Sequence, residues 1–327
     1  MNEYDLIRRI AAHFPRHALP GNTLFGCDAE IVEIGGQPWG LTVDEFTPEE
    51  DHFTREDPAR LGRNLAIATL SDLLAAGAAP RFFLSSLALP RAVDLAFADG
   101  LASGLASALA EAGCIHCGGD LGTADPWRFT GFAMGPVARA QPLTRRVPEG
   151  AQSLCVTGAL GDLNLAVFCG HPTPALELRL REAEWIREHA SACIDTSGGF
   201  FDALWLLHQQ SPGVRFRVNR QAIPLAPGVR AFSQTQGIPP EAVLLGGAGE
   251  YELLFTVPAG VMAESPPLFA ETSITVVGDT GAGAAGIVIQ DNGRERRMER
   301  PPPCPREAGS MKEHADAVIR RAGELLS

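Results

Sequence analysis

Residues 57–80 read DPARLGRNLAIATLSDLLAAGAAP, an apolar stretch with helical spacing. Asp57 and Pro58 are typical of a helix N-terminus, because a side-chain oxygen can cap the first turn and proline fits the first helical position. Gly77 predicts the end of the helix. Asp72 lies inside this otherwise apolar run, where a charged side chain is costly unless a cation or a hydrogen-bond donor meets it. We therefore predict a helix with a wide buried face that carries a functional carboxylate.

Strands and helices mix along the whole chain. Before residues 57–80 the sequence predicts an amphipathic helix in residues 1–15 and a hairpin of strands 31–34 and 39–43 around Gly35 and Gly36. Further strands are expected at 82–89, 115–117, 129–137, 153–157, 192–195, 216–218, 253–257, 274–277 and 287–290. Further helices are expected at 95–112, 163–168, 176–189, 200–208 and 310–326. This mixture predicts an α/β (α+β) fold rather than a helical bundle or a β-sandwich.

The chain is long enough for two domains. It has 327 residues, and a typical domain holds roughly 100–200 residues. The segment 139–151 contains Pro142, Pro148 and Gly150 and has no clear apolar period, so we interpret it as a linker. We therefore predict one domain at residues 1–140 and another at 141–300, followed by a proline-rich connector and a helix at 301–327.

Composition argues against several classes of protein. The formal net charge of -12 disfavours nucleic-acid binding, which usually needs a basic surface. No run approaches the roughly 18 apolar residues of a membrane-spanning helix, and residues 1–15 lack the long apolar core of a targeting segment. The number of cysteines, 7, is odd, and most lie in apolar surroundings. We therefore expect reduced thiols in a cytoplasmic protein that binds neither nucleic acid nor membrane.

Cys114 and Cys117 form a C-x-x-C pair. Two buried thiols on a strand are the simpler interpretation, and redox chemistry or half of a zinc site is the alternative. A structural zinc site needs a second pair of ligands, and the sequence offers none at suitable spacing.

Five aspartates stand in unusual contexts. They lie at a strand end, in a glycine turn or inside an apolar helix: Asp28, Asp44, Asp72, Asp120 and Asp195. Asp120 directly follows Gly118 and Gly119, which we expect to form a turn where small residues let a ligand approach the backbone. Mg²⁺ prefers hard oxygen ligands, usually one or two carboxylates per ion together with phosphate oxygens and water. Any single aspartate could instead be a helix cap or a turn residue, but the set indicates cations around a triphosphate.

Short motifs follow one another along the chain in a specific order. They are Gly26-Cys27-Asp28-Ala29, Thr42-Val43-Asp44, His52-Phe53, Leu70-Ser71-Asp72-Leu73, Leu84-Ser85-Ser86, Gly118-Gly119-Asp120, Val156-Thr157-Gly158, Asp195-Thr196-Ser197 and Gly249-Glu250-Tyr251-Glu252. With this series the chain resembles the thiamine-monophosphate kinase family, within the AIR-synthase-related superfamily, over roughly residues 20–280. Each motif alone is weak, whereas their common order is specific.

The resemblance implies a PurM-like fold of two domains. The N-terminal domain would contribute half of a β-barrel that a second chain completes in a homodimer, and the C-terminal domain would be an α/β sandwich. ATP and Mg²⁺ are the implied cofactors. The family reaction transfers a phosphoryl group from ATP to thiamine monophosphate, and such catalysis depends mainly on positioning and charge neutralisation.

The resemblance also implies roles for individual residues. The metal ligands would be Asp28, Asp44, Asp72, Asp120 and Asp195. The nucleotide would contact Ser71, Gly118, Gly119, Asp120 and Arg145. The catalytic residues would be Asp195, Ser197 and Arg145. The substrate would contact His52, Phe53, Glu250 and Tyr251.

Three acidic positions of the family are neutral in this chain, at Cys27, Gly198 and Gly249. Asn64, Thr69 and Leu121 depart from the family pattern as well. A cysteine is a poor ligand for magnesium, and one lost ligand in such a site can raise a barrier by roughly 3–4 kcal/mol. We therefore expect nucleotide binding to be retained and the chemistry on the acceptor side to be altered. Cys27 is either a tolerated small residue or a nucleophile.

Three functions follow from these observations. The first is a phosphotransferase that uses ATP and Mg²⁺ and acts on thiamine monophosphate or a related small phosphorylated acceptor. The second is another ATP-using enzyme of the superfamily, which activates an amide or carbonyl oxygen as a phosphate. The third is a non-catalytic nucleotide-binding protein in which the C-terminal helix docks a partner.

Overall fold

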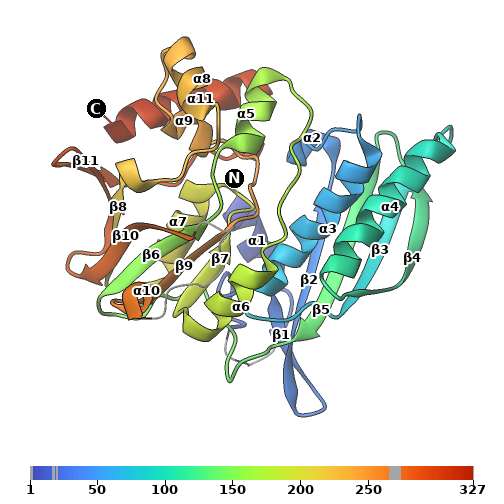
Figure 1. Cartoon of the computed structure of the whole chain (residues 1–327), viewed down its shortest axis with the longest axis horizontal. Coiled ribbons are helices and arrows are strands. Elements are labelled where there is room, and N and C mark those ends of the chain that lie inside the picture. The colour runs from blue at the N-terminus through green and yellow to red at the C-terminus, as the bar shows by residue number, and fades with distance from the viewer. Residues whose placement is uncertain (1–2, 17–18, 20, 265–273, 327) are drawn as a thin grey trace.

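The computed structural model describes residues 3–16, 19, 21–264 and 274–326. Two β-sheets lie on opposite sides of a central layer that contains helices α3 (Pro58–Ala75) and α6 (Leu180–His189) (Figure 1). The first sheet is built from the N-terminal part of the chain and the second from the remainder. The mixed α/β architecture predicted from the sequence is thereby confirmed.

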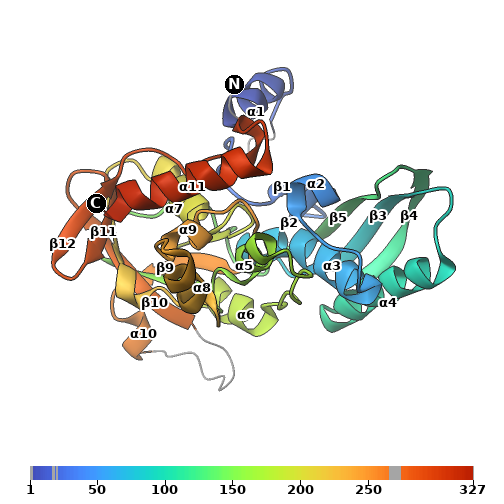
Figure 2. The same cartoon turned by 90° about the horizontal axis from the view of Figure 1, so that it is seen from above.

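The first sheet has five strands in the order β1-β2-β5-β3-β4. The strands are β1 Glu30–Ile34, β2 Gln37–Phe46, β5 Arg128–Pro136, β3 Phe82–Leu89 and β4 Ile115–Thr123. Only the β3–β4 pair is parallel among the pairs of this sheet in the described chain. Helices α3 and α4 (Leu95–Glu111) cover one face, and the short α2 (Pro48–Asp51) follows β2 (Figures 1 and 2).

The second sheet has seven strands in the order β12-β11-β8-β10-β6-β9-β7. The strands are β12 Arg294–Met298, β11 Gly286–Asp291, β8 Val214–Asn219, β10 Ile274–Ala282, β6 Gln152–Thr157, β9 Leu253–Pro258 and β7 Ala192–Asp195. The other helices are α1 Glu3–Ala11, α5 Asp162–Cys169, α7 Phe200–Gln210, α8 Val229–Gln236, α9 Glu241–Leu244, α10 Val261–Glu264 and α11 Met311–Leu326, with short 3₁₀ turns at Arg220–Ala222 and Pro305–Glu307.

Apolar side chains cover both faces of the seven-stranded sheet. One core extends from the five-stranded sheet through α3 and α6 and includes Phe255 on β9. The other core contains Leu254, the preceding residue of β9, together with α7 and α11. Successive residues of a strand point to opposite faces, so β9 contributes to both cores. The first core continues between the two halves of the chain and fixes the position of one sheet relative to the other.

Helix α3 forms for the reasons given by its sequence. The Asp57 carboxylate accepts a hydrogen bond from the backbone N–H of Arg60 at 3.0 Å, and Pro58 occupies the first turn. The helix ends at Ala75, just before Gly77, whose φ of 74° lies in the left-handed region that glycine adopts without strain. Most of its residues are buried, because the helix lies between the two sheets. Asp72 is thereby placed in the interior of the molecule.

Several predicted elements differ from the observed ones. The turn expected at Gly118 and Gly119 is wrong, because β4 continues through these residues and pairs in parallel with β3, with a shift of register between the Phe83–His116 and Ser85–Gly119 pairs. A Cβ atom on Gly119 would lie 2.0 Å from the carbonyl oxygen of Ser85, so glycine permits this close strand pairing. Helix α6 begins at Leu180 rather than at Leu176, whose backbone N–H instead donates to Asn64. Strand β12 and helices α8 and α9 were not predicted.

Within the described part of the chain, no helix combines the length and the apolar character that a bilayer span requires. The five-stranded sheet is open rather than closed into a barrel. None of the described residues forms a layer over its face opposite α3 and α4 (Figure 2).

A candidate metal centre between the two sheets

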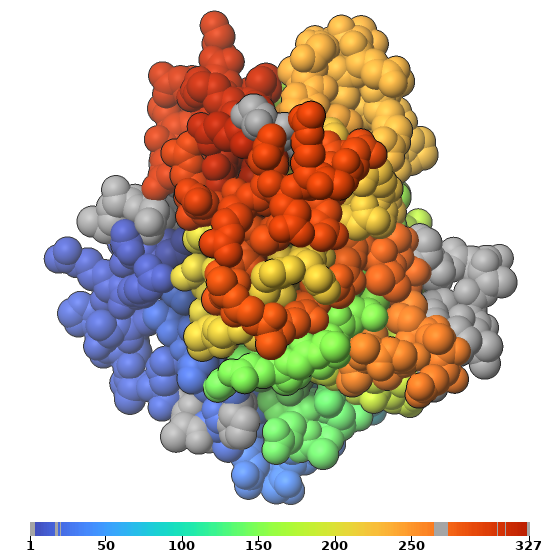
Figure 3. Space-filling model, turned by 90° about the vertical axis from the view of Figure 1, so that its left-hand side faces the viewer, coloured from blue at the N-terminus to red at the C-terminus, as the bar shows by residue number. Residues whose placement is uncertain are grey.

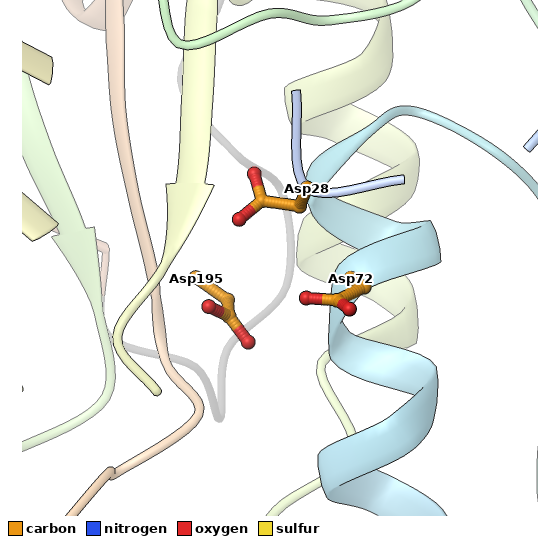
Figure 4. Close-up of side chains that lie close together, drawn as sticks. All are labelled: Asp28, Asp72 and Asp195. Atoms are coloured by element: carbon orange, nitrogen blue, oxygen red, sulfur yellow. The ribbon is translucent and has the colours of Figure 1, made fainter. Parts of the chain in front are cut away.

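Three carboxylates from distant parts of the sequence meet between the sheets. Asp28 lies in the loop before β1, Asp72 lies on α3, and Asp195 ends β7. Each offers one oxygen atom, and these atoms lie within 4.8 Å of one another. Figure 4 shows the three side chains pointing toward a common space. Like charges this close repel, so the arrangement needs a compensating positive charge.

Part of that charge comes from Arg145. Its guanidinium donates to Asp28 Oδ1 at 2.7 Å, and the exposed fractions of the two side chains are 15% for Arg145 and 1% for Asp28. Asp28 Oδ2 is buried and has no hydrogen-bond partner in the described structure, and the same holds for Arg145 Nε. A buried oxygen without a partner costs free energy unless an ion or water meets it. The orphaned oxygen in a set of hard carboxylate donors fits Mg²⁺.

Hydroxyl groups orient the other two carboxylates. Thr42 Oγ1 donates to Asp72 Oδ2 at 2.5 Å, and Ser71 Oγ donates to Asp195 Oδ2, also at 2.5 Å. The backbone N–H of Ser197 lies 3.3 Å from Asp195 Oδ1. Each aspartate still has capacity to accept further bonds, since a carboxylate offers about four lone-pair sites. The hydroxyls therefore fix the carboxylates in place without neutralising them.

Asp44 adds a fourth negative charge nearby. It shares the helix-facing side of β2 with Thr42, because residues two apart on a strand point to the same face. Burial, followed by the charges of Asp195, Asp51 and Asp28, raises the pKa of Asp44 to about 7. Burial followed by the charge of Asp44 raises the pKa of Asp72 well above its usual range. The site thus accumulates more negative charge than its protein environment compensates.

The glycine motif predicted to bind the nucleotide lies elsewhere. Gly118, Gly119 and Asp120 are on β4 at the edge of the five-stranded sheet, and Asp120 is exposed. Asp120 is not a member of the group formed by the other three aspartates in the described residues. The roles of these three residues stay predictions.

Of the residues predicted to contact the substrate, His52 lines a cavity, whereas Phe53, Glu250 and Tyr251 do not. His52, Thr54, His171 and Thr173 line a cavity of about 420 Å³ between the loop after α2 and the loop after α5. Phe53 is buried behind His52, and its ring lies 6.2 Å from that of Tyr251. Burial, followed by the charges of Asp51 and Asp44, raises the pKa of Tyr251 well above its usual range. Tyr251 is thus within electrostatic reach of Asp44, and Phe53 connects Tyr251 to His52 at the wall of the cavity.

Glu250 has a different environment from the one expected of a substrate contact. Its carboxylate accepts hydrogen bonds from the backbone N–H groups of Gly161 and Leu163, at the N-terminus of α5. Burial raises the pKa of Glu250 to about 8 despite these bonds. The neighbouring Glu252 pairs with Arg179 at 2.5 Å and accepts from Thr157. Both glutamates therefore hold the loop that carries Tyr251.

Sequence comparison finds similarity to known proteins over most of the chain. A family model described as AIR synthase related protein, N-terminal domain, matches residues 26–137. Over these residues the chain is similar to the AIR-synthase-related proteins. It is similar to thiamine-monophosphate kinase of Pyrococcus abyssi, with 29% identity over 314 residues that cover 91% of this chain and 93% of the kinase. It is also similar to thiamine-monophosphate kinase of Aquifex aeolicus, with 26% identity over 253 residues that cover 72% of this chain and 81% of the kinase.

Several solved structures share the fold of this chain. Thiamine monophosphate kinase from Aquifex aeolicus has a TM-score of 0.72 and 23% identity, covering 90% of this chain and 99% of that chain. AaThiL complexed with AMPPCP and TMP has a TM-score of 0.75 and 23% identity, and the match covers 91% of this chain and 95% of that chain. The hydrogenase maturation protein HypE of E. coli has a TM-score of 0.67 and 17% identity, and the match covers 83% of this chain and 89% of that chain. At these identities the likeness establishes the fold alone.

The positions at which this chain departs from the superfamily motifs have structural explanations. Cys27 is half-buried and donates to the Leu143 carbonyl oxygen at 3.1 Å, and burial raises its pKa to about 12, which favours the neutral thiol. A Cβ atom on Gly249 would lie 2.2 Å from the carbonyl oxygen of Ser197, so a larger residue there requires a shift of the backbone. A Cβ atom on Gly198 would lie 2.5 Å from a carboxylate oxygen of Asp202. A side chain at position 198 or 249 would therefore require neighbouring atoms to move.

Sequence reasoning did not identify several residues that shape the site. Thr42 was quoted only as part of a motif, yet its hydroxyl holds Asp72. Asp51 contributes negative charge to both Asp44 and Tyr251. Arg179 holds Glu252 from a segment expected to be helical. The alternation of polar and apolar residues along 37–46 could have placed Thr42 beside Asp44, but no local signal marks Arg179.

The pH dependence of stability should reveal the crowded carboxylates. Burial raises the pKa of Asp28 to about 6 and that of Asp44 to about 7, from an ordinary value of 3.8. Between about pH 4 and pH 7 the folded protein therefore binds more protons than the unfolded chain, so the stability of the metal-free protein falls as pH rises. Mg²⁺ needs the ionised carboxylates, so its affinity rises over the same window.

Thermal unfolding at a series of pH values, with EDTA and with Mg²⁺, measures both trends. We expect the unfolding temperature in EDTA to fall from about pH 5 to pH 7.5, and the stabilisation by Mg²⁺ to grow. A metal-free unfolding temperature that rises steadily through this window would contradict the assigned electrostatics. The variant Asp99→Asn, which changes an exposed carboxylate on α4, is the control and should follow the parent profile.

Proposed function

We propose that this protein is an ATP- and Mg²⁺-dependent phosphotransferase of the thiamine-monophosphate kinase type. It transfers the γ-phosphate of ATP to a small phosphorylated acceptor, with thiamine monophosphate as the first candidate. The observation that carries the proposal is the group of Asp28, Asp72 and Asp195, in which one buried carboxylate oxygen has no hydrogen-bond partner among the described residues. Relatives named thiamine-monophosphate kinase, which match over most of the chain, support it.

In this proposal Asp28, Asp44, Asp72 and Asp195 hold Mg²⁺. When bound, the ion neutralises the negative charge of the phosphates, which is the main requirement of phosphoryl transfer. Arg145 holds Asp28 in place and presents a guanidinium edge toward a phosphate. These residues pre-organise the electrostatics, so little rearrangement accompanies the reaction.

The proposed acceptor site is the cavity lined by His52, Thr54, His171 and Thr173. Burial lowers the pKa of His52, so its imidazole is neutral near pH 7 and can donate or accept one hydrogen bond. Ser197 is exposed beside Asp195 and can contact a group entering between the cavity and the acidic residues. Ser71 acts in this proposal by orienting Asp195.

We also propose the domain organisation expected from the sequence. Residues 1–140 form the metal- and nucleotide-binding domain, residues 141–300 form the second α/β domain, and residues 301–327 form the connector and the final helix. The two sheets support this division, because one is built from the first segment and the other from the second. None of the seven cysteines, all of which lie in the described residues, forms a disulfide, which supports a reducing, cytoplasmic setting.

A homodimer is part of the proposal. The uncovered face of the five-stranded sheet carries two apolar rows across β2, β5 and β3, namely Leu41, Met134 and Phe82 in one and Val43, Phe132 and Leu84 in the other. The exposed fractions of Val43 and Leu84 are 64% and 40%. A contiguous apolar patch of this kind marks an interaction surface, and a second copy presents a matching one.

Val43→Glu should convert the dimer into a monomer, because it places a charge in the centre of the apolar face. Size-exclusion chromatography with light scattering measures the change, and the mass should fall from that of two chains to that of one. Leu95→Glu is the matched control, since Leu95 is 76% exposed on α4 and lies away from this face. A parent protein that is monomeric, or a Val43→Glu variant that remains dimeric, would contradict the proposed interface.

Chromatography of a reaction that contains the protein, ATP, Mg²⁺ and thiamine monophosphate tests the proposed activity. We expect thiamine diphosphate and ADP to appear in equal amounts, with neither formed by the Asp72→Asn variant. Calorimetric titration of the parent with ATP and Mg²⁺ is performed in parallel. Absence of both products from a protein that binds ATP and Mg²⁺ would overturn the kinase assignment while leaving the binding site intact.

The missing acidic groups favour one alternative. A superfamily enzyme that activates an amide or carbonyl oxygen as a phosphate would retain the aspartate group but differ on the acceptor side. Gly198 and Gly249 stand where the kinase family has acids, and Gly249 cannot gain a side chain without moving the Ser197 backbone. ADP formation that depends on an amide or carboxylate cosubstrate, rather than on thiamine monophosphate, would identify this alternative.

A further inference from the structure

Helix α1 lies beside both loops that deliver aspartates to the metal centre. One of these loops leads to Asp28 and belongs to the N-terminal part of the chain, whereas the other follows Asp195 and belongs to the second part. Figure 3 shows the N-terminal segment, in blue, on the surface next to yellow atoms of the second part. A single side chain of α1, Tyr4, makes contacts on both sides.

The first contact is with the loop that carries Asp28. The ring of Tyr4 meets the ring of Phe25 edge to face, with 5.5 Å between the ring centroids, and the Arg8 guanidinium lies 5.5 Å from the centroid of the same ring. Phe25 has a φ of 63°, which is unusual for an aromatic residue and persists only where the surroundings fix it. The next residue, Gly26, accepts a hydrogen bond from the backbone N–H of Arg145 at 2.9 Å.

The second contact is with the loop that follows Asp195. The hydroxyl of Tyr4 donates to Asp202 Oδ1 at 2.9 Å. Asp202 lies in the first turn of α7, and its other oxygen, Oδ2, lies 2.5 Å from the position that a Cβ atom on Gly198 would take. The Asp202 carboxylate therefore packs directly on the loop formed by residues 195–199, and a side chain at position 198 would displace it.

We propose that Tyr4 is a positioning residue that links the Asp28 loop to the Asp195 loop and thereby sets the separation of two metal-binding carboxylates. The inference rests on the metal site of the proposed function. Mg²⁺ and Mn²⁺ bind tightly only when their oxygen ligands are held at short, well-defined distances. Groups that orient metal ligands from outside the first layer typically change metal affinity by about 10–100-fold when they are removed.

Tyr4→Phe is the sharpest test, because it removes the hydroxyl and keeps the ring against Phe25. Calorimetric titration with Mn²⁺ should give a dissociation constant about 10-fold higher than that of the parent. Thermal unfolding with EDTA is measured in parallel, because a purely structural role would lower the unfolding temperature and leave the Mn²⁺ dissociation constant unchanged. Arg9→Lys, an exposed position on the same helix, is the control and should match the parent.

A double-mutant cycle with Asp202→Asn separates linkage from independent effects. If Tyr4 acts through Asp202, the double variant should bind Mn²⁺ no more weakly than the worse of the two single variants. Additive losses of Mn²⁺ binding free energy in the double variant would overturn the linkage. An unchanged Mn²⁺ dissociation constant in a folded Tyr4→Phe protein would overturn it as well.

Two outcomes distinguish this inference from the proposed metal site itself. If the parent protein binds Mn²⁺ and Asp72→Asn does not, while Tyr4→Phe binds as tightly as the parent, the metal site stands and the positioning role fails. If the parent protein binds no Mn²⁺ at all, the metal site fails and the positioning role fails with it.

Discussion

Asp72→Asn should abolish Mg²⁺-dependent binding of ATP and reduce turnover by at least about 100-fold. The variant removes one of three carboxylates that lie within 4.8 Å of one another, yet it keeps the size of the side chain and an oxygen atom for the Thr42 hydroxyl. The metal-free variant should also unfold at a higher temperature than the parent, by about 2 °C or more. This opposite effect arises because the charge of Asp72 is buried and lies beside Asp44, Asp195 and Asp28.

Calorimetry with ATP and Mg²⁺ measures the loss of binding, and thermal unfolding in EDTA measures the gain of stability. Asp99→Asn makes the same chemical change at an exposed position on α4 and should alter neither quantity. An Asp72→Asn protein that binds ATP and Mg²⁺ as tightly as the parent would show that the metal centre is assigned to the wrong residues. A loss of binding that accompanies a lower unfolding temperature would indicate misfolding rather than loss of a ligand.

Arg145→Met should lower the free energy of unfolding by about 3–5 kcal/mol in EDTA at neutral pH. The substitution keeps the apolar stem of the side chain but leaves Asp28 buried, with an exposed fraction of 1%, and without its cation. Mg²⁺ should recover part of the loss, because a divalent cation compensates the charge of Asp28 that the guanidinium no longer meets. Urea denaturation with and without Mg²⁺ measures both quantities.

Arg139→Met provides a matched control for this prediction. Arg139 is also half-buried, but its guanidinium donates to the backbone carbonyl of Ala190, at 3.3 Å, rather than to a carboxylate. We expect Arg139→Met to lower the free energy of unfolding by about 1 kcal/mol, and we expect Mg²⁺ to restore none of this loss. If Arg139→Met and Arg145→Met lowered the free energy of unfolding equally, the pairing of Arg145 with Asp28 would not be the reason that Arg145 stabilises the protein.

The order of the motifs predicted the family, and the local patterns predicted most of the elements. Asp57, Pro58 and Gly77 mark the ends of α3 because capping and chain reversal depend on a few neighbouring residues. The strands at 82–89 and 192–195 were predicted with the bounds that the structure shows. Such signals act over one or two turns of chain, so a single sequence contains them.

The course of β4 could not be predicted in the same way. Gly118 and Gly119 are typical turn residues, and the pairing of Gly119 with Ser85 of β3, just after a shift of register, explains why the strand continues. Helix α6 likewise starts later than its apolar pattern suggests, because Asn64 of α3 captures the backbone of Leu176. In both cases a distant partner supplies the hydrogen bond that overrides the local preference.

The sequence by itself determined which residue types the site contains: an aspartate inside an apolar helix, another at a strand end and a third in the glycine-containing loop before the first strand. Only the tertiary structure decided that Asp28, Asp72 and Asp195 converge, that Asp120 lies apart on β4, and that Glu250 caps α5. The reason is physical. A residue's type and its local conformation depend on neighbours in the chain, whereas the distance between carboxylates 44 or 123 positions apart depends on how two sheets pack around one helix.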